Sequence, residues 1–265
     1  MTNSGPVALI TGAAKRIGAA MACQLHSEGY RVIIHYGHSK DEALALAEKL
    51  NSQREDSATC LQANLCNSDE VSALGQRALG IWGQINVLVN NASSFYPTPV
   101  GEISEDDWVS LIGSNVKGPL FLSQALAPAL AVSKGCIINM VDMHIDRPLP
   151  KHSVYLIAKS GLASLTQSLA IDLAPNVRVN GIAPGAILWP EREMDEDEKD
   201  KLISSIPLGE LGTPNDIAKT LSFLASAPYI TGQIIYVDGG YLSDSTPTEL
   251  KSQEHPVPPD DPDPK

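Results

Sequence analysis

The sequence lacks a cationic leader and any long apolar segment. Its first residues, MTNSGPVALITG, contain only a short apolar stretch, and no apolar run reaches the roughly 18 residues that a membrane-spanning helix needs. These absences argue against a secretory signal and against a transmembrane segment. We therefore expect a cytoplasmic protein that does not bind a membrane.

Cysteine is scarce and is not patterned for chemistry. The four cysteines (Cys23, Cys60, Cys66 and Cys136) form no CxxC pair and have no histidine cluster beside them. This spacing favours reduced, mostly buried thiols over zinc ligands or disulfides. No metal site is expected.

Basic residues are few, with 19 Lys and Arg against 31 Asp and Glu, and the formal charge is -12. A surface that binds nucleic acid or anionic lipid needs clustered Lys and Arg, so we expect no nucleic-acid partner. Two segments hold much of the negative charge. We interpret EREMDEDEKD (191–200) as a solvated helix face, with part of a lid as the alternative, and the proline-rich residues 244–265 as a flexible tail.

Short apolar segments alternate with segments of helical spacing along the rest of the chain, which is long enough to bury one large core. The predicted strands are 7–11, 31–36, 59–65, 85–90, 136–141, 177–183 and 233–240. The predicted helices are 16–28, 41–53, 105–113, 118–131, 153–173 and one that follows TPND (213–216). This alternation predicts an α/β fold: a single-domain, doubly wound Rossmann fold over residues 1–243. Its seven-stranded parallel sheet would carry helices on both faces and bind ligands at the carboxyl ends of the strands.

A glycine loop, TGAAKRIG (11–18), follows the first predicted strand and opens the first predicted helix. In this context the backbone amides and the helix dipole face a pyrophosphate. Gly12 and Gly18 keep two permissive positions, and Ile17, directly before Gly18, is a further candidate cofactor contact. Arg16 stands where the related GxxxGxG form has a glycine, and we expect its guanidinium to contact a phosphate or the substrate.

The end of the second predicted strand, HYGHS (35–39), contains no acid. An acid at this place holds the ribose hydroxyls of NAD, whereas a 2′-phosphate requires its absence. His38 and Ser39, with Lys15 and Arg16 nearby, are candidate phosphate partners, so NADPH is the expected cofactor. Solvated loop histidines are the alternative interpretation. His35 and Tyr36 are also expected beside the cofactor.

Tyr155 and Lys159 lie four residues apart on the long predicted helix, so they share a face. A nearby ammonium lowers the pKa of a phenol, which is about 10 when unperturbed, and a lysine can also hold the ribose of the cofactor. Taken alone, YxxxK is common by chance. Here it follows NNA (90–92) and Asn115, and it precedes Pro184 and Gly185.

With these motifs, residues 6–243 resemble the short-chain dehydrogenase/reductase family, in which Asn, Ser, Tyr and Lys act in hydride transfer. The resemblance implies a homotetramer in which the helices at 118–131 and 153–173 pack between subunits. The chain departs from the family at Asp142, which occupies the usual serine position. The positions that match family cofactor contacts are Asn64, Leu65, Asn91, Ala92, Ser93, Asn115, Tyr155, Lys159, Pro184 and Gly185.

Three departures coincide and resemble the pteridine reductase branch of the family: Arg16, NNASSFYPTP (90–99) and Asp142. In that branch the loop arginine and a serine contact the cofactor and the pterin, a phenylalanine stacks on the pterin ring, and the aspartate works with the tyrosine. The resemblance therefore implies substrate contacts by Arg16, Ser93, Phe95, Asp142 and Tyr155, with Leu188 and Trp189 on a substrate loop at about 187–207. Tyr96 is a weaker candidate.

The catalytic set expected from this resemblance is Asp142, Tyr155 and Lys159. The expected activity is NADPH-dependent reduction of dihydropterins, of the dihydrobiopterin or dihydromonapterin type, to tetrahydropterins, with oxidised pterins and dihydrofolate as further substrates. One alternative is a general ketone or 3-oxoacyl-carrier-protein reductase, and another is a non-catalytic NADP-binding regulator. Core packing for Phe95 and Trp189, and a strand-end carboxylate bonded to backbone amides for Asp142, are the structural alternatives.

Overall fold

A single parallel sheet organises the protein, for which the computed structural model describes residues 5–189 and 195–243. The order of its seven strands is β3-β2-β1-β4-β5-β6-β7. The strands are β1 (Val7–Ile10), β2 (Arg31–Tyr36), β3 (Ala58–Gln62), β4 (Val87–Asn90), β5 (Cys136–Met140), β6 (Arg178–Pro184) and β7 (Ile234–Val237). The predicted seven-stranded parallel sheet is therefore confirmed.

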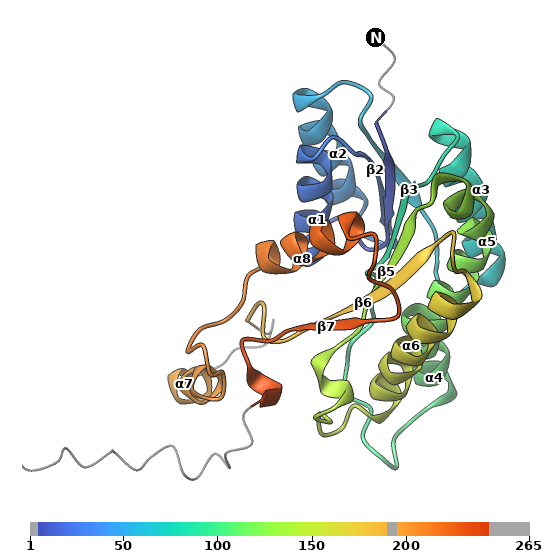
Figure 1. The fold of residues 1–265 in the computed structure, drawn as a ribbon. Helices are drawn as coiled ribbons and strands as arrows, with labels where there is room; N and C mark the ends of the chain where they lie inside the picture. Colours follow the sequence, from blue (N-terminus) through green and yellow to red (C-terminus); the bar gives the residue numbers. More distant parts are fainter. Residues whose placement is uncertain (1–4, 190–194, 244–265) are drawn as a thin grey trace, which may run out of the picture.

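Helices cover both faces of the sheet, as a doubly wound fold requires (Figure 1). One face carries α1 (Arg16–Ser27), α2 (Lys40–Gln53) and α8 (Pro214–Ser226). The other carries α3 (Ser68–Trp82), α4 (Glu105–Ile112), α5 (Gly118–Ser133) and α6 (Ser153–Asp172). Between these layers the central strands β1 and β5 are buried along their whole length, which explains why the sequence of β1 is a continuous apolar run and does not alternate.

Helix α3 is not among the elements expected from sequence, although its ends carry clear signals. The side chain of Asn67 accepts hydrogen bonds from the N–H groups of Asp69 and Glu70, and the helix stops at Gly83 in a left-handed conformation (φ 73°). The strand before it is also shorter than expected. Because β3 ends at Gln62, Asn64 lies in the following turn and not at the strand end.

One helix, α6, is long and apolar enough to cross a membrane by length and composition alone. This helix has 20 residues and a mean hydropathy of 1.2, so it passes by length and composition. Its buried residues include Ala158, Leu162 and Ala170, and it also buries Lys159. Packing against the sheet accounts for this apolar composition.

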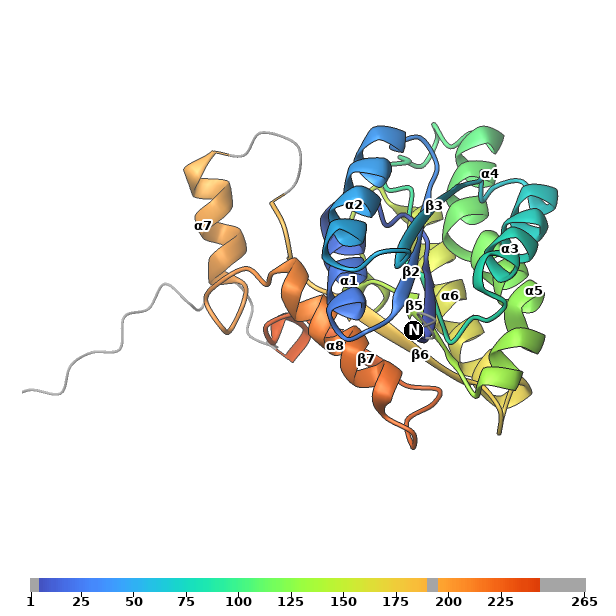
Figure 2. The ribbon, with the colours of Figure 1, turned by 90° about the horizontal axis from the view of Figure 1, so that it is seen from above.

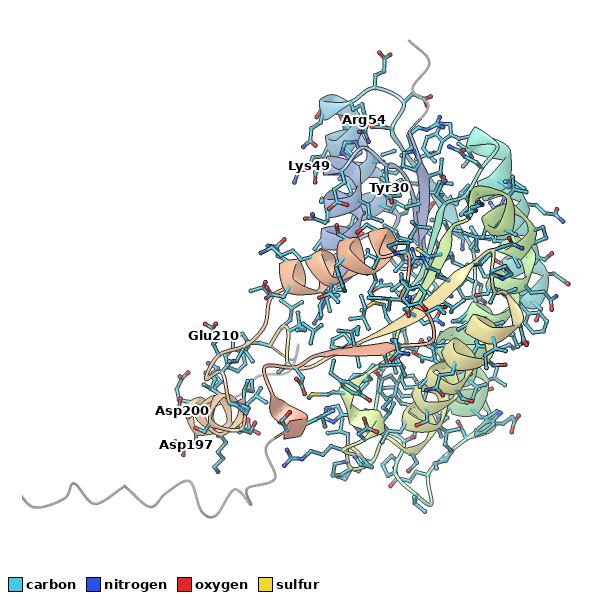
Figure 3. The ribbon with its side chains drawn as sticks, viewed as in Figure 1. Tyr30, Lys49, Arg54, Asp197, Asp200 and Glu210 are labelled. Carbon is cyan, nitrogen blue, oxygen red and sulfur yellow. The ribbon has the colours of Figure 1, made fainter. Side chains whose placement is uncertain are left out.

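Helix α7 (Glu196–Ser204) stands beyond α8 and β7, away from the body of the sheet (Figure 2). It has no buried residue, and the acidic side chains of Asp197, Asp200 and nearby Glu210 gather at this corner (Figure 3). The interpretation as a solvated helix face therefore holds for the described part of the acidic segment. Residues 190–194 of the expected substrate loop and the expected tail at 244–265 lie outside the described residues.

The cysteine expectation needs a correction. All four cysteines are free, but only Cys136 is buried, while Cys23, Cys60 and Cys66 are half-buried. Burial raises the pKa of the Cys136 thiol to about 11, which keeps it protonated and unreactive. Within residues 5–189 and 195–243, no group of three or more His, Cys, Asp or Glu side chains could hold a metal ion.

Candidate active site

The site is built where the strand order reverses, between β1 and β4, so the loops that follow these strands meet at one edge. Thr11 joins them. Its hydroxyl oxygen accepts the N–H groups of Asn91 at 2.9 Å and Ala92 at 3.0 Å. The side-chain amide of Asn91 in turn donates to the carbonyls of Thr11 (2.9 Å) and Gly12 (3.0 Å). The loop after β4 therefore braces the glycine loop.

The glycine loop is too tightly packed for side chains at its two glycines. Gly12 has φ +61°, and a Cβ there would lie 2.8 Å from the Cα of Ala92. A Cβ at Gly18 would lie 2.3 Å from the carbonyl oxygen of Gly12. Arg16 also adopts a left-handed conformation (φ 55°), which explains why related loops have glycine at this position.

The start of α1 suits a pyrophosphate. Its N-cap, Lys15, makes no side-chain capping bond, and the first turn contains no acid. The positive end of the helix therefore carries no acid in its own first turn and no N-cap side-chain hydrogen bond at the place where dinucleotide folds bind phosphates. The residues present fit a nicotinamide dinucleotide.

The candidates for the 2′-phosphate lie at the start of α2. His38 is exposed, and Ser39 is the N-cap of α2 without a side-chain capping bond. Lys15 forms an exposed ion pair with Glu42 (3.2 Å). His35, by contrast, is 2% exposed, and its imidazole is hydrogen-bonded inside the protein, beneath the glycine loop.

Asn115 sits in a one-turn π-helix, Gly113–Lys117, between α4 and α5, an irregularity common at functional sites. The residue is fully buried, and its amide donates to the carbonyls of Ser94 and Leu111, both at 3.0 Å. Its oxygen accepts the hydroxyl of Ser93 at 2.7 Å. The structure therefore uses Asn115 to orient Ser93 and the loop after β4.

Asp142 and Tyr155 meet. The phenol of Tyr155 donates to Oδ2 of Asp142 at 2.5 Å. The other carboxylate oxygen, Oδ1, accepts the N–H of His144 at 2.8 Å and so caps the short helix Met143–Ile145. The alternative interpretation of Asp142, a strand-end carboxylate bonded to backbone amides, therefore applies to one oxygen only. Oδ1 accepts a backbone N–H, whereas Oδ2 accepts the phenol of Tyr155.

The electrostatics of Tyr155 differ from the sequence argument. Burial and the adjacent Asp142 carboxylate raise the pKa of the phenol well above its ordinary value, with a smaller opposite effect from Ser93. Lys159 does not lower it: the Nζ atom lies 5.7 Å from the Tyr155 ring centre and donates to the Met140 carbonyl at 2.7 Å. Desolvation lowers the pKa of Lys159 to about 8, although Asp142 opposes this shift. The phenol therefore holds its proton firmly at neutral pH.

Phe95 lies beside this pair and is 55% exposed, so the core-packing alternative is wrong. Its ring contacts the Tyr155 ring edge-on, with centroids 4.9 Å apart. On another side it stacks on His152, with centroids 4.7 Å apart and planes 14° apart. An exposed aromatic ring held at two contacts next to a proton donor is a suitable platform for a flat ligand.

The remaining expected residues follow the strand ends. Pro184 ends β6, and Gly185 is packed so closely that a Cβ there would lie 2.5 Å from the Cα of Asp238. Leu188 and Trp189 are 36% and 41% exposed and immediately precede the residues that the structure does not describe. The half-buried Tyr36, Ile17 and Tyr96, together with the buried Leu65, pack against the apolar clusters beneath the site.

Sequence reasoning missed two residues that shape the site. His152, which stacks on Phe95, is three residues before Tyr155 on the same helix end, and that spacing could have identified it. Thr11, which bridges the two loops, belongs to the quoted glycine motif but was not singled out. Both act by holding other residues, a role that composition and spacing do not reveal.

The fold and the site together define an oxidoreductase that uses a nicotinamide cofactor. A family model described as enoyl-(acyl carrier protein) reductase matches residues 12–242. Pteridine reductase 1 of Leishmania tarentolae is 38% identical over 285 residues, covering 91% of this chain and 98% of that protein. The 3-oxoacyl-(acyl-carrier-protein) reductase of Staphylococcus aureus is also 38% identical, over 245 residues and the same shares of each chain.

The corresponding reductase of Staphylococcus epidermidis is 37% identical over 238 residues, which cover 88% of this chain and 97% of that protein. The chain belongs to the short-chain dehydrogenase/reductase family. The two kinds of relative are equally similar in overall sequence. The substrate must therefore be argued from the residues that line the site.

Proposed function

We propose that this protein is an NADPH-dependent pteridine reductase that converts dihydropterins, of the dihydrobiopterin or dihydromonapterin type, to tetrahydropterins. Oxidised pterins and dihydrofolate are further substrates in this proposal. The observation that carries it is the 2.5 Å hydrogen bond from the Tyr155 phenol to Asp142, a carboxylate at the place where the resemblance leads one to expect a serine hydroxyl.

The chemistry favours a ring nitrogen over a ketone oxygen. Reducing a C=N bond adds a hydride to carbon and a proton to nitrogen; the hydride would come from NADPH held by the glycine loop and Lys159. Asp142 and Tyr155 act as a pair: the phenol, which is protonated at neutral pH because its pKa is raised, donates the proton to the ring nitrogen, and the half-exposed Asp142 carboxylate orients the phenol through their hydrogen bond. Solvent replaces the proton after the transfer. A ketone reductase needs only a hydroxyl to hold the carbonyl oxygen, so a carboxylate there has no role.

The flatness of a pterin explains Phe95. A planar heterocycle stacked between the nicotinamide and this ring has both of its faces buried in contact with other rings. Its polar edge stays free to form hydrogen bonds with Ser93 and Arg16. The exposed ring of Phe95 next to Tyr155 supports this placement. Leu188 and Trp189, at the start of the substrate loop proposed for residues 187–207, complete the pocket in this proposal.

Lys159 holds the cofactor. Its ammonium donates one N–H to the Met140 carbonyl, and this hydrogen bond fixes the orientation of the ammonium group. The other donors can reach the ribose hydroxyls of the nicotinamide half. The proposed preference for NADPH has three supports. Residues 35–39 contain no acid, His38 is exposed, and the hydroxyl of Ser39 makes no capping hydrogen bond to α2 and can bind a phosphate.

A second candidate is a 3-oxoacyl-carrier-protein reductase, favoured by the equal identity of the staphylococcal enzymes. We place the protein in the cytoplasm. We also infer a homotetramer through α5 and α6, which expose apolar side chains that a subunit interface would cover. Those residues are Leu120, Phe121, Val132, Ile157 and Ile171.

A steady-state substrate panel tests the proposal. Oxidation of the reduced cofactor by the purified protein is followed by the loss of its nicotinamide absorbance. The substrates are dihydrobiopterin, dihydromonapterin, dihydrofolate and an acetoacetyl thioester, each tested with NADPH and with NADH. The proposal expects kcat/KM for a dihydropterin to exceed that for the thioester by at least tenfold, with NADPH preferred. Brisk turnover of the thioester without turnover of any pterin would establish the second candidate.

A further inference from the structure

We propose that His35 is a positioning residue: its imidazole ties the glycine loop to the turn after β3 and so fixes the loop that binds the cofactor phosphates. The proposal rests on the nicotinamide cofactor of the family and not on the pterin substrate. Its failure and the failure of the pterin assignment are therefore independent.

Both ring nitrogens of His35 are occupied by backbone. Nδ1 lies 3.2 Å from the amide nitrogen of Gly12, and Nε2 lies 3.1 Å from the carbonyl oxygen of Ala63. A carbonyl can only accept, so Nε2 carries the hydrogen and Nδ1 is the bare acceptor for the Gly12 N–H. One neutral tautomer satisfies both contacts.

The backbone of His35 adds a third tie. Its carbonyl accepts the N–H of Ala13 at 3.0 Å. Two successive amides of the glycine loop, those of Gly12 and Ala13, therefore point back toward β2. The amides left for a phosphate are those at the start of α1, and the hydrogen bonds to His35 set where that start lies.

The hydrogen bond to Ala63 connects His35 to the second segment that is expected to contact the cofactor. Asn64 and Leu65, two of the proposed cofactor contacts, follow Ala63 directly. The backbone N–H of Asn64 is itself held by Glu70 at 2.8 Å. One buried side chain thus links the loops after β1 and β3, on either side of the strand that carries it.

The surroundings keep the imidazole neutral. His35 is 2% exposed, and burial lowers its pKa to about 4, with the guanidinium of Arg77 acting in the same direction and the Ala63 carbonyl opposing it. Arg77 belongs to α3 and donates to the carbonyl of Gln62, the last residue of β3, at 2.6 Å. The acceptor at Nδ1 is available throughout the neutral range.

The chain offers a matched control in His26. It is 3% exposed, its pKa is also lowered by burial, and its Nε2 lies 2.7 Å from the Ser57 hydroxyl. It lies in the last turn of α1 and bonds the residue that precedes β3, so it is at the amino ends of the strands, opposite the glycine loop. Losing it removes a buried histidine without touching the glycine loop.

The test separates the two side-chain bonds of His35. In His35→Asn, the amide oxygen replaces Nδ1 and still accepts from Gly12. In His35→Gln, the amide nitrogen replaces Nε2 and donates to Ala63. His35→Leu keeps neither bond, and His26→Leu is the control. The NADPH Kd of each full-length variant is measured by nicotinamide fluorescence, together with its thermal unfolding midpoint.

We expect His35→Leu to weaken NADPH binding about tenfold, which corresponds to about one hydrogen bond, and His35→Asn to stay within about threefold of the parent. His26→Leu should lower the unfolding midpoint and leave the Kd unchanged. Equal Kd values for the Leu and Asn variants would overturn the proposal. Should the Leu variant not fold, the Asn and Gln variants decide: tighter binding by Asn supports the positioning role, and equal binding refutes it.

Discussion

The two halves of the site are built differently. In the cofactor half, around Gly12, His35 and Asn91, nearly every contact joins a side chain to a backbone amide or carbonyl. In the substrate half, the contacts join side chains to one another, as in the pair Asp142 and Tyr155 and in the stack on Phe95. The first half is largely buried, whereas the second exposes an aromatic ring.

This difference indicates where each half gets its specificity. Backbone ties fix a loop whatever the neighbouring side chains are, so the cofactor half suits a ligand common to a whole family. Side-chain contacts change with single substitutions, so the substrate half can differ between relatives of equal overall identity. The carboxylate of Asp142 is such a substitution.

The largest effect expected in the substrate half is from Phe95→Ala. Removing the ring should raise the KM for a dihydropterin about tenfold, because an aromatic pair contributes about 1 kcal/mol beyond its area. The NADPH Kd should not change, since no backbone tie of the cofactor half is touched. Steady-state kinetics and a cofactor titration measure the two quantities.

The control is Phe223→Ala, because Phe223 on α8 is equally exposed at 55%. It should leave both KM and kcat unchanged. An unaltered pterin KM in Phe95→Ala would remove the stacking role. A parallel loss in both variants would assign the effect to general stability.

A smaller effect is expected from pH at the boundary of the two halves. The folded pKa of Lys159 is lowered to about 8, so its ammonium is present below pH 8 and is lost as the pH rises through that value. NADPH binding should be about fourfold weaker at pH 8.5 than at pH 7. A fluorescence titration across pH 7 to 9.5 measures it, and Lys159→Met should give a flat profile. A flat profile in the parent would show that the ammonium does not hold the cofactor.

The lowered pKa of Lys159 affects the stability of the fold in the opposite direction to cofactor binding. The folded pKa lies below that of the unfolded chain, so burial of Lys159 destabilises the fold below pH 8, and this penalty declines as the pH rises toward 10.5. Stability and cofactor binding therefore respond in opposite directions to pH at this one residue.

Much of the fold could be predicted because its signals are local. Apolar strands that alternate with helices fixed the parallel sheet, and the glycine spacing at Gly12 and Gly18 indicated the dinucleotide loop. Tyr155 and Lys159 share a helix face, as four-residue spacing requires. The contact of Asp142 with Tyr155 was expected from a family resemblance and not from spacing.

The sequence did not predict how deeply a side chain is buried or which residues distant in the chain surround it. The sign of the Tyr155 pKa shift was wrong because it depends on burial and on Asp142, 13 residues away, and not only on the lysine one turn along. His35 is a candidate cofactor contact from the sequence, but strand alternation does not reveal that both of its ring nitrogens meet backbone atoms. Helix α3 was missed although Asn67 and Gly83 mark its ends.

The most direct test of the central claim is a double-mutant cycle on Asp142→Ser and Tyr155→Phe, read as kcat/KM for dihydrobiopterin. If the two groups deliver one proton as a pair, the double variant will be no worse than the poorer single variant to within about threefold, with the NADPH Kd unchanged throughout. Losses that multiply, or an Asp142→Ser variant that loses cofactor affinity as strongly as activity, would contradict the account.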